Sequence, residues 1–223
     1  MAKKEDISSS VIKRLPRYYR FIGELIEQGN LKISSADLAE RMSLTASQIR
    51  QDLNCFGGFG QQGYGYNLPE LREEIGRILG VDRERRAILI GAGNLGKAIA
   101  THMQFEKYGM RLCGIFDSDP VKAGSIAAEM PIRPMTELDG FIAENKPEIA
   151  ILCIPKAAAG DIAEKLAVSG IKAFWNFSHY DMRQIEKKYS GIIIVNVHLG
   201  DSLMTLAYGL NHMPSEINGS ACR

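Results

Sequence analysis

The hydrophobic and polar positions along the chain fall into two successive patterns. Residues 11–55 have the spacing of amphipathic helices, whereas residues 86–200 alternate short, continuous apolar runs with helical segments. The apolar runs are Ala87–Ile90, Leu112–Phe116, Ile149–Ile154, Ala173–Phe177 and Ile192–Val197. Continuous apolar strands separated by helices predict a parallel sheet covered by helices on both faces. We therefore expect a helical N-terminal part followed by an α/β domain.

The same patterns predict the domain boundaries. Leu68–Asp82 has helical periodicity, with Pro69 near its start and Gly80 near its end, the places that these residues favour in helices. This helix is expected to link the two regions. A last helix is expected over Ser202–Asn211, after the sheet is complete. The predicted organisation is an N-terminal domain at 1–82, an α/β domain at 83–200 and a C-terminal helical segment at 201–223.

Two short helices joined by a tight turn are predicted between residues 34 and 54. Ser35 is the expected N-cap of the first helix, and Thr45 with Gln48 fits a capping box at the start of the second. This arrangement is typical of a helix-turn-helix, whose second helix enters the major groove of DNA. Arginine there can bond guanine and glutamine can bond adenine. The residues expected to contact DNA are Ser47, Gln48, Arg50 and Gln51.

Glycine alternates with aromatic residues between Cys55 and Tyr66. Such a segment suits a two-stranded wing that approaches the DNA backbone closely. The helix expected before the helix-turn-helix is basic, with no acid among residues 13–20. Together these features predict an α+β winged helix; the further DNA-binding candidates are Arg14, Phe59, Gly60, Gln61 and Tyr64. Singly, each feature also fits a structural hairpin, a solvated face or a flexible turn.

A glycine-rich motif, GxGxxG, follows the first predicted strand of the α/β domain and opens a helix. In a dinucleotide-binding fold, these glycines allow a tight turn, close approach to the pyrophosphate and close packing of helix on strand. The next strand ends in an acid, which bonds the adenosine ribose and repels a 2′-phosphate, so we expect NAD(H) rather than NADP(H). A Rossmann-like fold without a ligand is the alternative. The cofactor-binding candidates are Gly91, Ala92, Gly93, Asn94, Leu95, Gly96, Asp117 and Ser118, with Ile154, Pro155, Asn176 and Phe177 at later strand ends.

Composition narrows the remaining classes of function. The net charge of +1 does not indicate a nucleic-acid partner by itself, so any basic patch is local. The four cysteines are far apart and form no CxxC, which argues against a disulfide framework or a cysteine-rich zinc site and suits a reducing cytosol. No apolar stretch reaches about 18 residues and the first residues lack a signal-peptide pattern. We expect a cytoplasmic protein without a membrane span or a bound metal.

The chain resembles the Rex family of redox-sensing transcriptional repressors. The resemblance covers nearly the whole chain, and the segments that carry it are Arg14–Arg20, Gln48–Leu53, Phe56–Tyr66, Gly91–Gly96, Phe116–Asp117 and Gly170–Phe177. It implies a homodimer that binds an inverted-repeat operator in double-stranded DNA through its winged helices. It also implies Rossmann domains that bind NAD(H), a last helix exchanged between subunits, and release of DNA when NADH rises. The family is not one of enzymes.

Three positions depart from the pattern of that family. Gln51 stands where the family usually has Lys, His102 where it has Tyr, and His198 where it has Asp. The resemblance implies that Arg20 of the first helix pairs with this Asp in one state of the switch, and a histidine cannot form the same ion pair. We therefore expect an altered, pH-dependent discrimination between NADH and NAD⁺, with Arg20, His102 and His198 as the switch residues.

Two other functions remain open from the sequence. Four histidines, at positions 102, 179, 198 and 212, could include the general acid of a small NAD-dependent oxidoreductase, although no substrate domain is left in the chain. Alternatively, a regulator whose Rossmann pocket binds another adenine nucleotide, or none, would bind DNA without responding to NAD(H).

Overall fold

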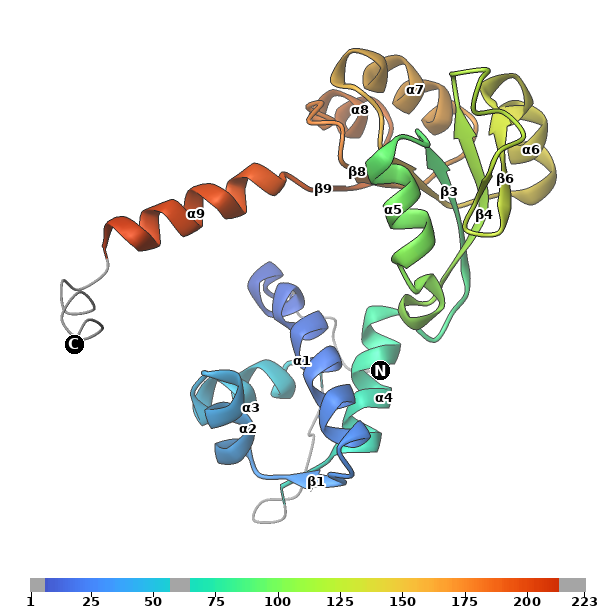
Figure 1. The fold of residues 1–223 in the computed structure, drawn as a ribbon. Coiled ribbons are helices and arrows are strands. Elements are labelled where there is room, and N and C mark those ends of the chain that lie inside the picture. The colour runs from blue at the N-terminus through green and yellow to red at the C-terminus, as the bar shows by residue number, and fades with distance from the viewer. Residues whose placement is uncertain (1–6, 57–64, 213–223) are drawn as a thin grey trace, which may run out of the picture. The chain divides into compact units, whose positions relative to one another are not determined.

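The computed structural model describes residues 7–56 and 65–212 (Figure 1). The chain divides into two compact units, Met1–Arg83 and Glu84–Arg223, each with its own buried apolar core. Four residues expected in the wing, Phe59, Gly60, Gln61 and Tyr64, lie outside the described residues. Among the described helices, none is long and apolar enough to cross a membrane.

The first unit packs helices around one core. Its elements are α1 (Ser9–Glu27), β1 (Lys32–Ile33), α2 (Ser35–Met42), α3 (Ala46–Asn54), β2 (Tyr66–Asn67) and α4 (Leu68–Leu79). The buried residues of α1 recur every three or four positions, from Val11 to Leu25, so one face of this helix lies in the core. The strands β1 and β2 form an antiparallel pair that brings Ile33 opposite Tyr66. This short ladder joins the chain before α2 to the chain after residues 57–64.

The linking helix α4 is defined by its ends. Asn67 caps its N-terminus by accepting from the Glu70 N–H, and Pro69 lies in its first turn. Gly80 ends it in the left-handed conformation at φ +71°. The sequence analysis predicted this helix with the correct start, but its predicted end at Asp82 lies beyond the observed end at Leu79.

The second unit is a seven-stranded sheet with helices on both faces, as far as the structure describes it. Its elements are β3 (Arg85–Ile90), α5 (Asn94–His102), η1 (Phe105–Tyr108), β4 (Met110–Asp117), β5 (Ile126–Ala127), β6 (Met130–Pro134), η2 (Met135–Glu137), α6 (Leu138–Asn145), β7 (Ile149–Leu152), α7 (Lys156–Val168), β8 (Ala173–Asn176), α8 (Arg183–Lys188), β9 (Ile193–Asn196) and α9 (Leu199–Asn211). The strand order is β5-β6-β4-β3-β7-β8-β9, and every pairing is parallel except β5 with β6.

The strand order predicts where a ligand would bind to the sheet. The strands β4 and β6 follow on one side of β3, and the chain then crosses to β7 on the other side, so the strand order reverses beside β3. In open α/β sheets, ligands bind at this switch point, outside the carboxyl ends of the strands. One apolar cluster contains residues of α5 and the other contains residues of α6, α7 and α8, so the sheet is covered on both faces.

Several predicted boundaries are corrected by the structure. The apolar runs that the sequence extended to residues 154, 177 and 197 end as strands at Leu152, Asn176 and Asn196. Cys153, Ile154 and Phe177, which follow the ends of β7 and β8, still pack against the core from turns, so the apolar run is longer than the paired strand. The last helix begins at Leu199 rather than at Ser202.

Candidate functional site

The two short helices of the helix-turn-helix are positioned by hydroxyl caps. Ser34, rather than Ser35 as expected, caps α2, because its Oγ accepts from the Asp37 N–H at 3.0 Å. The turn passes through Ser43 in the left-handed conformation, at φ +54°. Thr45 then caps α3 by accepting from the Gln48 N–H at 3.1 Å. The Gln48 side chain does not complete the predicted capping box, because it bonds Asp52 instead.

The outer face of α3 is polar and exposed. Ile49 and Leu53 are buried, while Ser47, Arg50 and Gln51 point away from the core and Gln48 is half-buried. The guanidinium of Arg50 donates to the Ser35 hydroxyl at 2.9 Å, which joins the two helices across the turn. This face therefore offers an arginine and polar groups on one short helix, as groove reading requires.

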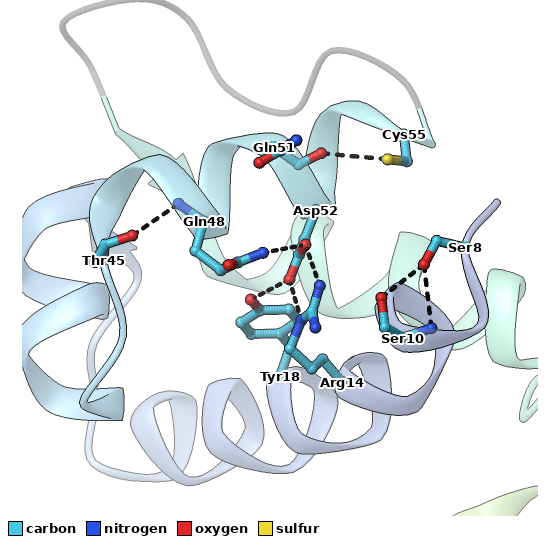
Figure 2. Close-up of polar contacts among 9 residues, drawn as sticks. All are labelled: Ser8, Ser10, Arg14, Tyr18, Thr45, Gln48, Gln51, Asp52 and Cys55. Carbon is cyan, nitrogen blue, oxygen red and sulfur yellow. Dashed lines mark hydrogen bonds and ion pairs between the residues drawn. The ribbon is translucent and has the colours of Figure 1, made fainter.

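A buried carboxylate on the inner face of α3 ties this helix to α1 (Figure 2). Asp52 is 1% exposed, and both of its oxygens accept from Arg14, Oδ2 from Nε at 2.6 Å and Oδ1 from Nη2 at 2.7 Å. The Tyr18 hydroxyl donates to the same carboxylate at 2.8 Å and the Gln48 amide at 2.9 Å. Two DNA-binding candidates, Arg14 and Gln48, are thus held by Asp52.

Asp52 is a residue that the sequence reasoning missed. Burial acts to raise its pKa, but the bonds from Arg14, Tyr18 and Gln48 outweigh burial and hold the pKa below the ordinary value. The available signal was its spacing, because Asp52 follows Ile49 by three positions and therefore lies on the inward face of the helix. A charge on that face needs a partner from another element.

The glycine-rich turn after β3 has three different steric environments. Gly91 has φ +99°, and a Cβ there would collide with the Cys153 carbonyl. A Cβ at Gly96 would collide with the Gly91 carbonyl, so α5 packs against the turn itself. At Gly93, no heavy atom among the described residues beyond its chain neighbours lies within 4 Å of the Cβ position. The open side of Gly93 and the N-terminus of α5 fit a phosphate-bearing ligand.

The acid at the end of β4 closes this turn. Asp117 is 6% exposed; its Oδ2 accepts from the Ala92 N–H at 2.7 Å and its Oδ1 from the Asp119 N–H at 2.8 Å. Lys122 also donates to Oδ2 at 3.0 Å. Burial acts to raise the pKa of Asp117, but these bonds together lower it. A charged acceptor therefore lies at the adenosine end of the predicted site, beside a cation that sequence reasoning did not include.

The later strand ends are held by an internal network. The Asn176 side chain, fully buried, donates to the Tyr180 carbonyl at 3.0 Å and to Asn196 Oδ1 at 2.8 Å. Its oxygen accepts from the backbone N–H and the hydroxyl of Ser178. Asn176 therefore fixes the ends of β8 and β9. The other candidates in these turns, Ile154, Pro155 and Phe177, are half-buried or exposed, as are Asn94, Leu95 and Ser118 near the glycine turn.

Two histidines meet beside these strand ends. His198 Nδ1 lies 2.9 Å from His179 Nδ1, with ring centroids 5.0 Å apart. His198 is the N-cap of α9, and His179 has φ +57° in the turn after β8. His102 is exposed at the end of α5, and Arg20 is exposed on α1 in the other unit. The sequence did not anticipate that His198 would contact His179.

Comparisons with known proteins cover most of the chain. A family described as "putative DNA-binding protein N-terminus" matches residues 6–54, and one described as "CoA binding domain" matches residues 82–180. The redox-sensing transcriptional repressor Rex of Thermoanaerobacter pseudethanolicus is 51% identical over 211 residues, covering 95% of this chain and 92% of the relative. The chain belongs to the Rex family. The predicted Rex resemblance is therefore confirmed.

Solved Rex structures share this fold. RSP in complex with β-NAD⁺ and operator DNA has a TM-score of 0.85 and 50% identity, covering 93% of this chain and 94% of that one. RSP in complex with β-NADH has a TM-score of 0.81 and 46% identity, covering 93% and 95%. The expected fold class, a DNA-binding domain followed by a Rossmann-like parallel sheet, is confirmed. Because Rex proteins are repressors, the oxidoreductase alternative is set aside.

Proposed function

We propose that this chain is a transcriptional repressor that binds operator DNA through α3 and responds to the redox state of NAD(H). The proposal rests on membership of the Rex family. The relative from Thermoanaerobacter pseudethanolicus is named a redox-sensing transcriptional repressor. The structures of RSP include a complex with NAD⁺ and operator DNA and a complex with NADH. The exposed polar face of α3 and the glycine turn after β3 are the parts of this chain that fit these two ligands. Its place of action would be the cytoplasm, where the DNA of a bacterium lies.

On the DNA side, we propose a division of roles within the first unit. Ser47, Arg50 and Gln51 are the exposed groups that would face the major groove. Arg14 and Gln48 bond Asp52, so they would position α3 rather than read bases. Phe59, Gly60, Gln61 and Tyr64 stay DNA-binding predictions from the sequence, because they lie outside the described residues.

Arg50→Ala should weaken binding to the operator by about tenfold to a hundredfold, since an arginine that bonds a base contributes about 1–3 kcal/mol of discrimination. Binding to unrelated duplexes should change much less. Gel shifts with operator and scrambled duplexes measure both quantities. Arg83→Ala is a matched control, because Arg83 is an exposed arginine of the same unit. Unchanged operator affinity in Arg50→Ala would remove this residue from the base-reading set.

On the cofactor side, the residues of the glycine turn would hold the dinucleotide. The N–H groups at the start of α5 and the open face of Gly93 fit a pyrophosphate, and Asp117 fits the adenosine ribose. The nicotinamide ring is positive in NAD⁺ and neutral in NADH, so charges near it can distinguish the two forms. The imidazoles of His179 and His198, which meet beside the ends of β8 and β9, would be polar groups near this ring.

The chain would act as a homodimer. Helix α9 is exposed along its whole length although it is rich in apolar residues: Leu199, Leu203, Leu206 and Leu210 share one side, and Met204 and Tyr208 lie on another. An apolar helix of this kind needs burial. The edge strand β9 also exposes Ile193 and Val195, at 65% and 54%. A second copy of α9 would cover such a surface, and two copies of α3 about 34 Å apart would read an inverted repeat.

Leu206→Glu should convert the dimer into a monomer, because a charge would replace an apolar side chain at the proposed contact. Sedimentation of the full chain measures the mass. Thr205→Glu, on the side of the same helix that carries Asp201, should remain dimeric. A dimer in both variants would contradict the role of α9.

The test of the proposed function is a gel shift on an inverted-repeat operator with no ligand, with NAD⁺ and with NADH. NADH should lower the affinity for the operator and NAD⁺ should not. Calorimetry with both dinucleotides at pH 6 and pH 8 tests the contribution of the histidines. A protein that prefers no duplex sequence under any of these conditions would overturn the proposal.

A further inference from the structure

A lysine lies against the acid at the end of β4. Lys122 Nζ is 3.0 Å from Asp117 Oδ2 and 3.8 Å from Asp119 Oδ2. Asp117 holds the position at which an acid bonds the adenosine ribose and repels a 2′-phosphate. A fixed ammonium group has the opposite preference, because it binds phosphate as a point charge. Two groups with opposite preferences for a 2′-phosphate are therefore in contact.

The turn after β4 fixes the backbone of Lys122. The Lys122 N–H donates to the Asp119 carbonyl at 3.1 Å. The Lys122 carbonyl accepts from the Ser125 N–H at 3.1 Å and from the Ser125 hydroxyl at 2.6 Å. The side chain is 32% exposed, so its charged end is directed to Asp117 while solvent still reaches it. Lys122 is therefore held at the adenosine end by the fold, unlike a lysine on an open surface.

We propose that Lys122 is a specificity-determining residue of the adenosine subsite, a phosphate-binding cation that Asp117 masks. This inference rests on the proposed binding of NAD(H). While Asp117 is present, it neutralises the lysine and its own charge repels a 2′-phosphate, so NADH is preferred over NADPH. When Asp117 is replaced by a neutral residue, the lysine charge is available to a 2′-phosphate. Asp119 competes weakly, because it is farther from Lys122 and 46% exposed.

The experiment measures NADH and NADPH binding by calorimetry on the full-length protein and three variants. Asp117→Ser should bind NADPH about tenfold more tightly than the wild type does, and NADH more weakly, because it exchanges a repulsive charge for an attractive one. Asp117→Ser combined with Lys122→Ala should lose the gain for NADPH. Lys122→Ala alone should keep the preference for NADH. Serine retains an acceptor for the Ala92 N–H, which Asp117 normally bonds.

Two controls separate this role from general effects. Lys172→Ala in the Asp117→Ser background should keep the gain for NADPH, since Lys172 is exposed at the opposite ends of the strands, just before β8. Asp117→Asn carries the same test with the shape of the side chain preserved, in case the serine variant does not fold. Thermal unfolding of each variant reports its folding.

The outcomes distinguish the two proposals. If neutral residues at 117 bring no gain for NADPH, or if the gain persists without Lys122, the inference is wrong and NADH binding by the wild type still supports the proposed function. If the wild type binds neither dinucleotide, the proposed cofactor site itself is wrong. A gain for NADPH that disappears with Lys122→Ala and survives Lys172→Ala is the result that we expect.

Discussion

Gly93→Ala should remove the response to NAD(H) while leaving the fold intact. Gly93 is the N-cap of α5 with φ −74° and ψ −172°, a conformation that alanine adopts without strain. Among the described residues beyond its chain neighbours, nothing lies within 4 Å of the position that its Cβ would take. The added methyl group therefore meets no protein atom, but it narrows the space in which a pyrophosphate approaches the backbone.

The expected size of this effect follows from steric crowding. Overpacking by a methyl group costs about 1–3 kcal/mol, which corresponds to a loss of about tenfold to a hundredfold in affinity for NADH. Calorimetry measures the affinity and thermal unfolding measures the stability, which should not fall. In the gel shift, the variant should bind the operator and NADH should fail to release it.

Two other glycines are the controls for this prediction. Gly140→Ala, on α6, also meets no described atom within 4 Å apart from its chain neighbours and the backbone of its own helix, and should leave NADH binding unchanged. Gly96→Ala should lower both stability and NADH binding, because its Cβ would collide with the Gly91 carbonyl and displace the backbone. If Gly93→Ala bound NADH as the wild type does, the glycine turn would not be the pyrophosphate site.

Asp52→Ala should destabilise the DNA-binding unit by about 3 kcal/mol. Removing one partner of a buried ion pair costs about 3–5 kcal/mol, and the lower figure applies because the Arg14 side chain is 31% exposed and water can reach it. The Tyr18 hydroxyl, at 1% residue exposure, also loses its acceptor. The melting transition of this unit should fall by about 10 °C or more. Operator binding should fall with it, because α3 loses its connection to α1.

Calorimetric scans of the full chain with and without NADH measure this prediction, since a ligand of the second unit should stabilise that unit alone. Asp82→Ala is the matched control, because Asp82 is an exposed acid of the same unit. Equal stability of Asp52→Ala and the wild type would show that the network does not hold α3 in place.

The pH dependence of this stabilisation has a definite sign. The pKa of Asp52 is lower in the folded protein than its ordinary value, so its stabilising contribution is complete above about pH 5 and is lost as the pH falls through the lower folded pKa. Asp52→Asn should lack this part of the acid sensitivity.

Local features of the sequence were sufficient for most elements. The cap at Thr45, the proline and glycine ends of α4 and the glycine spacing after β3 depend on residues within a few positions of one another, and the structure contains all three. The same reasoning failed at Gln48, whose side chain had two partners within reach. A capping box required the Gln48 side-chain oxygen to accept from the Thr45 backbone N–H, but the Gln48 side chain is instead oriented by its amide N–H, which donates to the buried carboxylate of Asp52.

The sequence by itself determined the two kinds of domain, the polar face of α3 and the glycine turn, because helical and strand periodicity and turn chemistry act over short distances. Only the tertiary structure decided which polar groups are already bonded. Asp52 with Arg14, Asn176 with Asn196, and His179 with His198 join separate elements, so their pairing depends on how those elements pack. That difference separates the groups that hold the site in place from the groups that a ligand can reach.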